Sequence, residues 1–181
     1  MKNQFNNLML DLETMGTTNN SAIVAIGAVA FDINSGQFGN EFYRTVNLQS
    51  CLLAGLEMNA STILWWLRQS EEARSELSKK DGIPLIQALS EFSDFCENKN
   101  YTIWGNSASF DCGILANAYN KAAIEIPWKF WNERCLRTLA NLRPEIKDLT
   151  QSVGTAHNAL DDCKFQINYC TKIFKSINNL T

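Results

Sequence analysis

The sequence is short of positive charge, of proline and of long apolar runs, and each shortage excludes a class of protein. Its 181 residues include 16 Lys and Arg against 19 Asp and Glu, a formal net charge of −3, which excludes a generic polybasic nucleic-acid binder. Three prolines leave no room for a Pro-rich linker. No apolar run approaches the roughly 18 residues that a membrane span needs, and the first residues lack the apolar stretch of a signal peptide. We therefore expect a soluble, cytoplasmic protein.

The cysteines also lack the spacing of a disulfide or zinc framework. The six form no CxxC pair, so we expect reduced thiols in the core or at the surface. There is a single histidine, and 45% of the residues are hydrophobic. This length and composition predict one domain, residues 1–181, with a sizeable core. The cysteines are Cys51, Cys96, Cys112, Cys135, Cys163 and Cys170.

Charge is unevenly distributed along the chain. Residues 1–100 contain 7 basic and 12 acidic side chains, whereas residues 101–181 contain 9 basic and 7 acidic ones. The second half is therefore the half that would attract a polyanion.

The first 46 residues have the pattern of an antiparallel meander. Apolar stretches at 8–10, 22–31 and 38–46 predict three strands, the last two joined by a tight turn at Ser35-Gly36. A short strand is expected again at 101–104. Strands first and helices interleaved afterwards indicate an α/β domain with a mixed sheet.

Helical signals begin near residue 61. Ser61 and Ser70 are candidate N-caps, and Pro84 stands where the first residue of a helix would. Residues 144–155 are polar and predict an irregular segment. Helices are expected over about 84–98, 110–122, 135–142 and 158–177.

Three acidic clusters are candidates for chemistry. Asp11 and Glu13 stand two residues apart on the first strand and therefore share one face. Because Leu10 and Leu12 are expected to be buried, this acid pair would repel itself unless a divalent cation lay between the carboxylates. Asp111 begins a helix, where an acid is also favoured by the helix dipole alone. The third cluster is His157-Asn158-Ala159-Leu160-Asp161-Asp162.

In order, these clusters read Asp-x-Glu, Asp and His-x4-Asp, which resembles the DEDD superfamily of 3′-5′ exonucleases in its histidine-type branch (DEDDh). The resemblance spans residues 8 to about 174. Four phrases are most similar to the phage exonuclease A (DexA) type, a subfamily that includes mycobacterial exoribonucleases and prophage exonucleases. These phrases cover residues 11–16, 63–70, 130–132 and 157–162.

The resemblance implies a ribonuclease-H-like three-layer α/β fold, with helices flanking a mixed sheet, and two Mg²⁺ or Mn²⁺ ions. On matching positions, Asp11 would bridge both ions, Glu13 and Asp162 would complete one ion site, and Asp111 would help hold the other. His157 would take a proton from the attacking water. This assignment agrees with what phosphodiester hydrolysis requires, since two cations stabilise charge on the attacking and leaving oxygens.

Two positions depart from a simple match. Asp161 and Asp162 are adjacent, so only one points into the site; the His-x4-Asp spacing selects Asp162. The superfamily's usual Gly-His-Asn-x-x-Phe-Asp is here Gly105-Asn106-Ser107 followed by Phe110-Asp111, so contacts made by that His-Asn pair do not carry over.

Substrate contacts are expected next to these motifs. Thr14 and Met15 follow the first motif, where related enzymes receive the terminal nucleotide, although a core role for Met15 is an equal alternative. Trp65 and Trp66 are consecutive in a helix and face different directions, so one could stack on a base while the other packs inside. A purely structural role for both is an equal alternative. Phe110 is expected to pack under the site. Candidate phosphate contacts are Lys129, Arg134, Arg137 and Lys164.

The sequence thus predicts a metal-dependent 3′-5′ exonuclease that acts on a free, preferably single-stranded 3′ end and releases nucleoside 5′-monophosphates. The sugar of the substrate, DNA or RNA, stays open, because no residue obviously reads a 2′-hydroxyl. A hydrolase of very short oligonucleotides or small nucleotides and an inactive nucleic-acid-binding module are the alternatives. Several superfamily members are homodimers, so a dimer is compatible with the resemblance.

Overall fold

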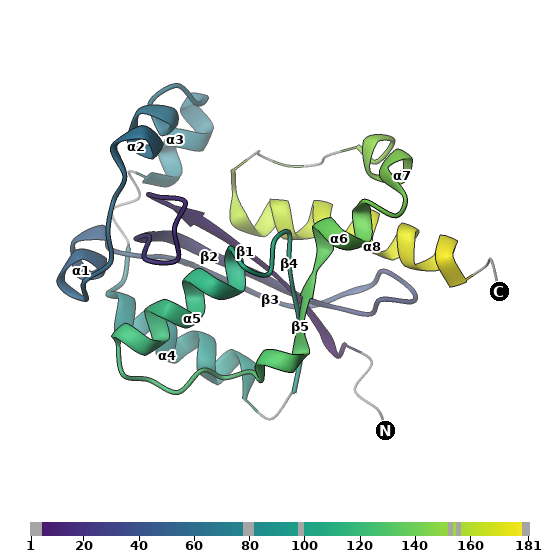
Figure 1. Ribbon diagram of the computed structural model, residues 1–181, viewed down its shortest axis with the longest axis horizontal. Coiled ribbons are helices and arrows are strands. Elements are labelled where there is room, and N and C mark those ends of the chain that lie inside the picture. The colour runs from purple at the N-terminus through teal and green to yellow at the C-terminus, as the bar shows by residue number, and fades with distance from the viewer. Residues whose placement is uncertain (1–4, 78–81, 98–99, 152–153, 155–156, 179–181) are drawn as a thin grey trace.

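The computed structural model describes residues 5–77, 82–97, 100–151, 154 and 157–178 (Figure 1). At its centre lies a five-stranded sheet in the order β3-β2-β1-β4-β5. The first three strands form the predicted antiparallel meander, and β4 and β5 run parallel to β1. The strands are β1 (Asn7–Thr14), β2 (Ile23–Phe31), β3 (Phe38–Thr45), β4 (Thr102–Gly105) and β5 (Glu133–Cys135). The predicted mixed sheet is therefore confirmed.

Helices cover both faces of this sheet (Figure 1). One hydrophobic cluster joins the sheet to α4 and α5, and the other joins its opposite face to α6 and α8. Within the described part of the chain, no helix is long and apolar enough to cross a membrane. The helices are α1 (Leu48–Leu53), α2 (Ala60–Trp66), α3 (Glu71–Leu77), α4 (Leu85–Cys96), α5 (Asp111–Lys121), η1 (Phe130–Asn132), α6 (Leu136–Ala140), α7 (Pro144–Asp148) and α8 (Ala159–Asn178).

Strand β1 sorts its side chains between the two clusters. Leu8 and Leu10 belong to the cluster with α4 and α5, whereas Met9 belongs to the cluster with α8. Because side chains alternate along a strand, Asp11 and Glu13 lie on the same face as Met9. The acid pair is thus directed at α8.

Helix α8 approaches the sheet closely at Gly27 of β2, the residue paired with Asp11 in register. A Cβ atom at Gly27 would lie 2.5 Å from the backbone carbon of Ala159 and 2.6 Å from its oxygen. The thiol of Cys163 donates to the carbonyl oxygens of Met9 and Gly27 at 3.5 and 3.4 Å. The first turns of α8 are therefore seated directly on β1 and β2.

Several sequence expectations were wrong in detail. Strand β5 was not predicted, because its three residues Glu-Arg-Cys carry no apolar alternation. Helix α7 occupies part of the segment expected to be irregular; it is short and polar and starts at Pro144. Ser61 lies inside α2, whose N-cap is Asn59, and Pro84 is the N-cap of α4 rather than its first residue. Ser70, as expected, precedes a helix, and its Oγ accepts from the N–H of Ala73.

Candidate active site

The centre of the site is Asp11 on β1. Its Oδ1 accepts a hydrogen bond of 2.7 Å from Nε2 of Gln166 on α8. The Oε1 atom of Gln166 is buried and has no hydrogen-bond partner among the described residues. The amide nitrogen of Gln166 is thus committed to Asp11, while its buried oxygen remains unpaired among the described residues.

The start of α8 brings two further predicted residues to Asp11 and Glu13. Asn158 caps the helix, since its Oδ1 accepts from the N–H groups of Leu160 and Asp161. Asp162 then turns toward the sheet and its Oδ2 accepts from the backbone N–H of His157 at 3.2 Å. His157 has a φ of 65°, a left-handed conformation that costs free energy for a non-glycine residue and often marks functional sites.

A candidate metal cluster results from this arrangement. Ligand atoms of Glu13, His157 and Asp162 all lie within 4.8 Å of one another. Glu13 is buried, and the other two residues are half-buried. Two carboxylates and an imidazole at this spacing suit a divalent cation.

Asp111 is the first residue of α5 and reaches the site from that helix. It is 3% exposed, its Oδ1 accepts from the N–H of Leu12, and its Oδ2 accepts from the N–H of Ser107, both at 3.3 Å. A Cβ on Gly105 would lie 2.9 Å from that Oδ2. Glycine at the end of β4 therefore leaves the space that this carboxylate occupies.

Burial raises the pKa of three of these carboxyl groups, and repulsion from the neighbouring acids adds to the rise at Asp11. The pKa of Asp11 is well above its usual value because of burial and then the charges of Asp111, Glu13 and Asp162. Burial raises the pKa of Asp111 to about 6 and also raises that of Asp162. An acidic cluster held together against its own repulsion fits divalent cations, which would remove that repulsion.

Aromatic rings pack around His157. Trp66 is 1% exposed and its indole N–H donates to the carbonyl oxygen of Thr14 at 3.0 Å. Trp65 is 41% exposed, and its ring meets the His157 ring edge-on at 4.9 Å between centroids. Trp66 is thus the tryptophan that packs inside, whereas the ring of Trp65 is partly exposed in the cavity.

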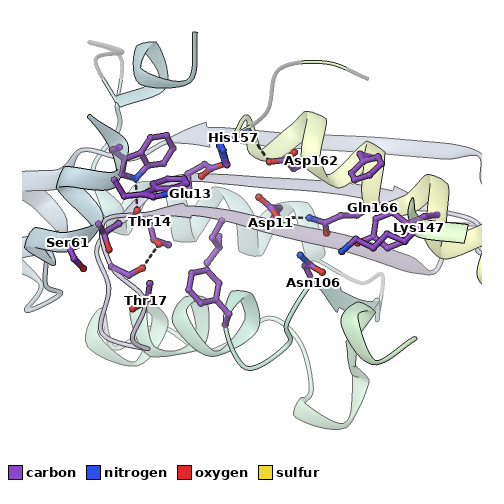
Figure 2. A pocket seen from close by; sticks show the side chains of 18 residues that line it. Asp11, Glu13, Thr14, Thr17, Ser61, Asn106, Lys147, His157, Asp162 and Gln166 are labelled. Atoms are coloured by element: carbon purple, nitrogen blue, oxygen red, sulfur yellow. Dashed lines mark hydrogen bonds between the residues drawn. The ribbon is translucent and has the colours of Figure 1, made fainter. Parts of the chain in front are cut away.

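A cavity of about 660 Å³ unites these groups, and Figure 2 shows it from close by. A neighbouring cavity of about 210 Å³ includes Asp11, Asp111 and Arg137. The larger cavity is lined by Asp11, Leu12, Glu13, Thr14, Gly16, Thr17, Ser61, Thr62, Trp65, Trp66, Asn106, Phe110, Lys147, His157, Asp162, Phe165, Gln166 and Tyr169.

Most of the predicted contact residues line these cavities, and two predictions with alternatives now have a placement. Thr14 and Phe110 line the larger cavity. Met15 is 5% exposed, belongs to the hydrophobic core and does not line either cavity, which matches its core alternative. Asp162 lines the cavity and Asp161 does not. The carboxyl group of Asp161 lies next to Gly154, where an added Cβ would collide with it.

Of the four candidate phosphate contacts, one lines a cavity and three do not. Arg137 lines the smaller cavity beside Asp111. Lys129, Arg134 and Lys164 line neither cavity; the nearest acid to Lys164 is Glu41, at 3.0 Å. The lining residues that sequence reasoning missed include Gln166, Tyr169 and Lys147. The first two stand four and seven residues after Asp162, so helical spacing could have found them, whereas nothing in the sequence marked Lys147.

Sequence comparison finds relatives among nucleases. A family model described as the 3′-5′ exoribonuclease Rv2179c-like domain matches residues 6–174. The exodeoxyribonuclease of enterobacteria phage T4 is 28% identical over 188 residues, which cover 86% of this chain and 83% of that protein.

Solved structures with a similar fold are exonucleases as well. The nuclease domain of 3′hExo, a DEDDh family member bound to rAMP, has a TM-score of 0.62 at 13% identity, with 97% of this chain and 95% of that chain covered. Escherichia coli exonuclease I in complex with a dA16 oligonucleotide has a TM-score of 0.63 at 18% identity, with 95% and 42% covered. At such identities the likeness establishes the fold, and the predicted ribonuclease-H-like class is confirmed.

Proposed function

We propose that this chain, which belongs to the 3′-5′ exoribonuclease Rv2179c-like domain family and is a DEDDh-type 3′-5′ exonuclease, acts on single-stranded DNA or RNA. It would remove nucleoside 5′-monophosphates from the 3′ end. We take residues 1–181 as one exonuclease domain. The observation that carries the proposal is the convergence of Asp11, Glu13, Asp162 and His157 on one cavity, with Asp111 beside Asp11 in the adjoining cavity.

The four acids are proposed to hold two Mg²⁺ or Mn²⁺ ions. Carboxylate oxygens are the ligands that these hard cations select. When bound, the ions would stabilise negative charge on the attacking and leaving oxygens of the phosphodiester. Gln166 would keep the Asp11 carboxylate in one orientation through its 2.7 Å hydrogen bond.

His157 is proposed as the general base. Water attacks phosphorus, its proton passes to the imidazole, and the bond from phosphorus to the 3′ oxygen of the preceding nucleotide breaks. The leaving 3′ oxygen takes a proton from solvent. The products are a 5′-monophosphate and a strand with a new 3′-hydroxyl. The Trp65 ring and the backbone hydrogen bond to Asp162 hold the histidine beside the acids.

Replacing His157 by Ala is therefore expected to slow turnover about a hundredfold or more while leaving most metal binding in place, since the carboxylates remain. Single-turnover cleavage and calorimetric titration with Mn²⁺ measure the two effects separately. An unchanged rate would remove histidine from its role, and a loss of Mn²⁺ binding equal to the loss of rate would make it a ligand instead.

The sugar of the substrate needs a direct test. The family model refers to an exoribonuclease and the phage T4 relative is an exodeoxyribonuclease. Matched 5′-labelled DNA and RNA oligonucleotides, single- and double-stranded, should be incubated with Mg²⁺ or Mn²⁺. We expect single strands to shorten one nucleotide at a time, and the Asp162→Asn variant to leave them intact.

The same experiment separates the two alternatives. Cleavage confined to dinucleotides or trinucleotides would indicate a hydrolase of very short oligonucleotides. If the protein bound the oligonucleotides but cleaved none of them with either Mg²⁺ or Mn²⁺, it would be an inactive binding module. The exonuclease proposal would then be abandoned.

A further inference from the structure

The larger cavity has two chemically different ends. Figure 2 shows Thr14, Thr17 and Ser61 at one end and Lys147 and Gln166 at the other, with Asp11 and Asp162 between them. Trp65 lies on the same helix as Ser61, α2, and its partly exposed ring can stack on a base. The carboxylates that would act on the scissile bond thus stand between an aromatic, hydroxyl-bearing end and an end that carries a lysine.

Lys147 is the only lysine or arginine among the described residues that line this cavity. It lies on α7, and its Nζ stands 5.9 Å from the centre of the Tyr169 ring, which is 1% exposed. Within the described part of the chain its ammonium group makes no ion pair. Lys147 is itself exposed, and the nearby aromatic ring favours positions of its cationic end beside the cavity.

An enzyme that cuts at a 3′ terminus has one nucleotide on one side of the scissile bond and the rest of the strand on the other. The terminal base is best received where an aromatic face and hydroxyl groups are available. The remaining strand brings further phosphates, each of which favours a cation that has no acidic partner. The two ends of the cavity match these two requirements.

We propose that Lys147 binds the phosphate immediately 5′ of the scissile one, so that α7 receives the strand that remains after cleavage. This inference rests on the proposed exonuclease activity and adds the direction in which the strand crosses the site. It assigns to α7 a substrate contact and identifies Lys147 as a residue that favours oligonucleotides over substrates with a single phosphate.

The test uses two oligonucleotides that differ at one linkage. In the second, the phosphate next to the scissile one is replaced by a neutral methylphosphonate, with deoxyribose at that nucleotide in both. Removal of the terminal nucleotide is measured for wild type, Lys147→Gln, Lys147→Arg and the control Lys121→Gln. Lys121 is an exposed lysine of α5 that does not line the cavity.

Wild type and Lys121→Gln should cleave the methylphosphonate substrate about tenfold less efficiently, mainly through KM, because a charge-assisted contact is lost. Lys147→Gln should be about tenfold slower on the normal substrate and show no further loss on the modified one. Lys147→Arg should behave like wild type. If Lys147→Gln discriminated between the two substrates as strongly as wild type, Lys147 would not contact that phosphate.

Binding measured by fluorescence anisotropy in Ca²⁺ gives the same comparison without cleavage. A wild-type protein that cleaves neither oligonucleotide would contradict the proposed function, while the anisotropy pattern would still decide on Lys147. Equal binding of both oligonucleotides by wild type would overturn the lysine contact and leave the exonuclease activity in place.

Discussion

Replacing Asp11 by Asn is expected to lower exonuclease activity at least about a thousandfold, the effect of losing several kcal/mol of transition-state stabilisation, and at the same time to stabilise the metal-free protein. Asn keeps an oxygen that accepts from Gln166 but removes a charge buried among three other acids. The pKa of Asp11 is raised in the folded state, so above that pKa its charge opposes folding. A gain on the order of 1 kcal/mol, or several degrees in Tm, is expected near neutral pH.

The stability difference between Asp11→Asn and wild type is expected to depend on pH. An acid with a raised folded-state pKa holds its proton more tightly when folded, so wild-type stability falls as pH rises from the ordinary value of 3.8 through the folded-state pKa. The stability gap between variant and wild type should therefore close at acidic pH. Mn²⁺ should raise the Tm of wild type and have little effect on Asp11→Asn.

The matched control is Asp94→Asn, an exposed acid of α4, which packs on the opposite face of the sheet. It should change neither activity nor the response to Mn²⁺. Thermal melts from pH 4 to 8, with and without EDTA, measure all of these quantities. An Asp11→Asn protein less stable than wild type in EDTA would show that the acid cluster is not repulsive.

The sequence was sufficient for the parts of the site that depend on periodicity. Period-two alternation on β1 put Asp11 and Glu13 on one face, and the His-x4-Asp spacing of the resemblance selected Asp162 over Asp161 at the start of α8. Both placements hold in the structure. The meander was predictable from its apolar stretches and the turn at Ser35-Gly36, and the mixed sheet from the order of strands and helices along the chain.

Tertiary neighbours decided the rest. Trp65 and Trp66 are the same residue type, and the sequence does not distinguish them; in the structure, Trp66 packs in the core and its indole N–H donates to the carbonyl of Thr14. Lys147 stands in a polar five-residue helix whose position beside Tyr169 depends on how α7 packs against α8. Strand β5 exists because β4 offers it a parallel edge, not because its residues favour a strand.

A Gly27→Ala variant is expected to lose about 3 kcal/mol of stability and most of its activity. The added Cβ would stand 2.5 to 2.6 Å from backbone atoms of Ala159, which cannot rotate away as a side chain could. Relief requires α8 to move outward by roughly 1 Å, and that helix carries Asp162 and Gln166 to Asp11. A displacement of this size can cost about a hundredfold in rate.

Gly113→Ala is the control, because it also adds one methyl group to a glycine near the site. Gly113 lies within α5, and the atom nearest to its Cβ would be Oδ1 of the Asn19 side chain, at 3.2 Å. Since alanine favours the helix by up to about 1 kcal/mol, this variant should be as stable as wild type or more so. Chemical denaturation and single-turnover cleavage of both variants compare the two sites. A Gly27→Ala protein with wild-type stability and rate would mean that α8 is not seated on the backbone of β2, and the contact that brings Asp162 to Asp11 would have to be sought elsewhere.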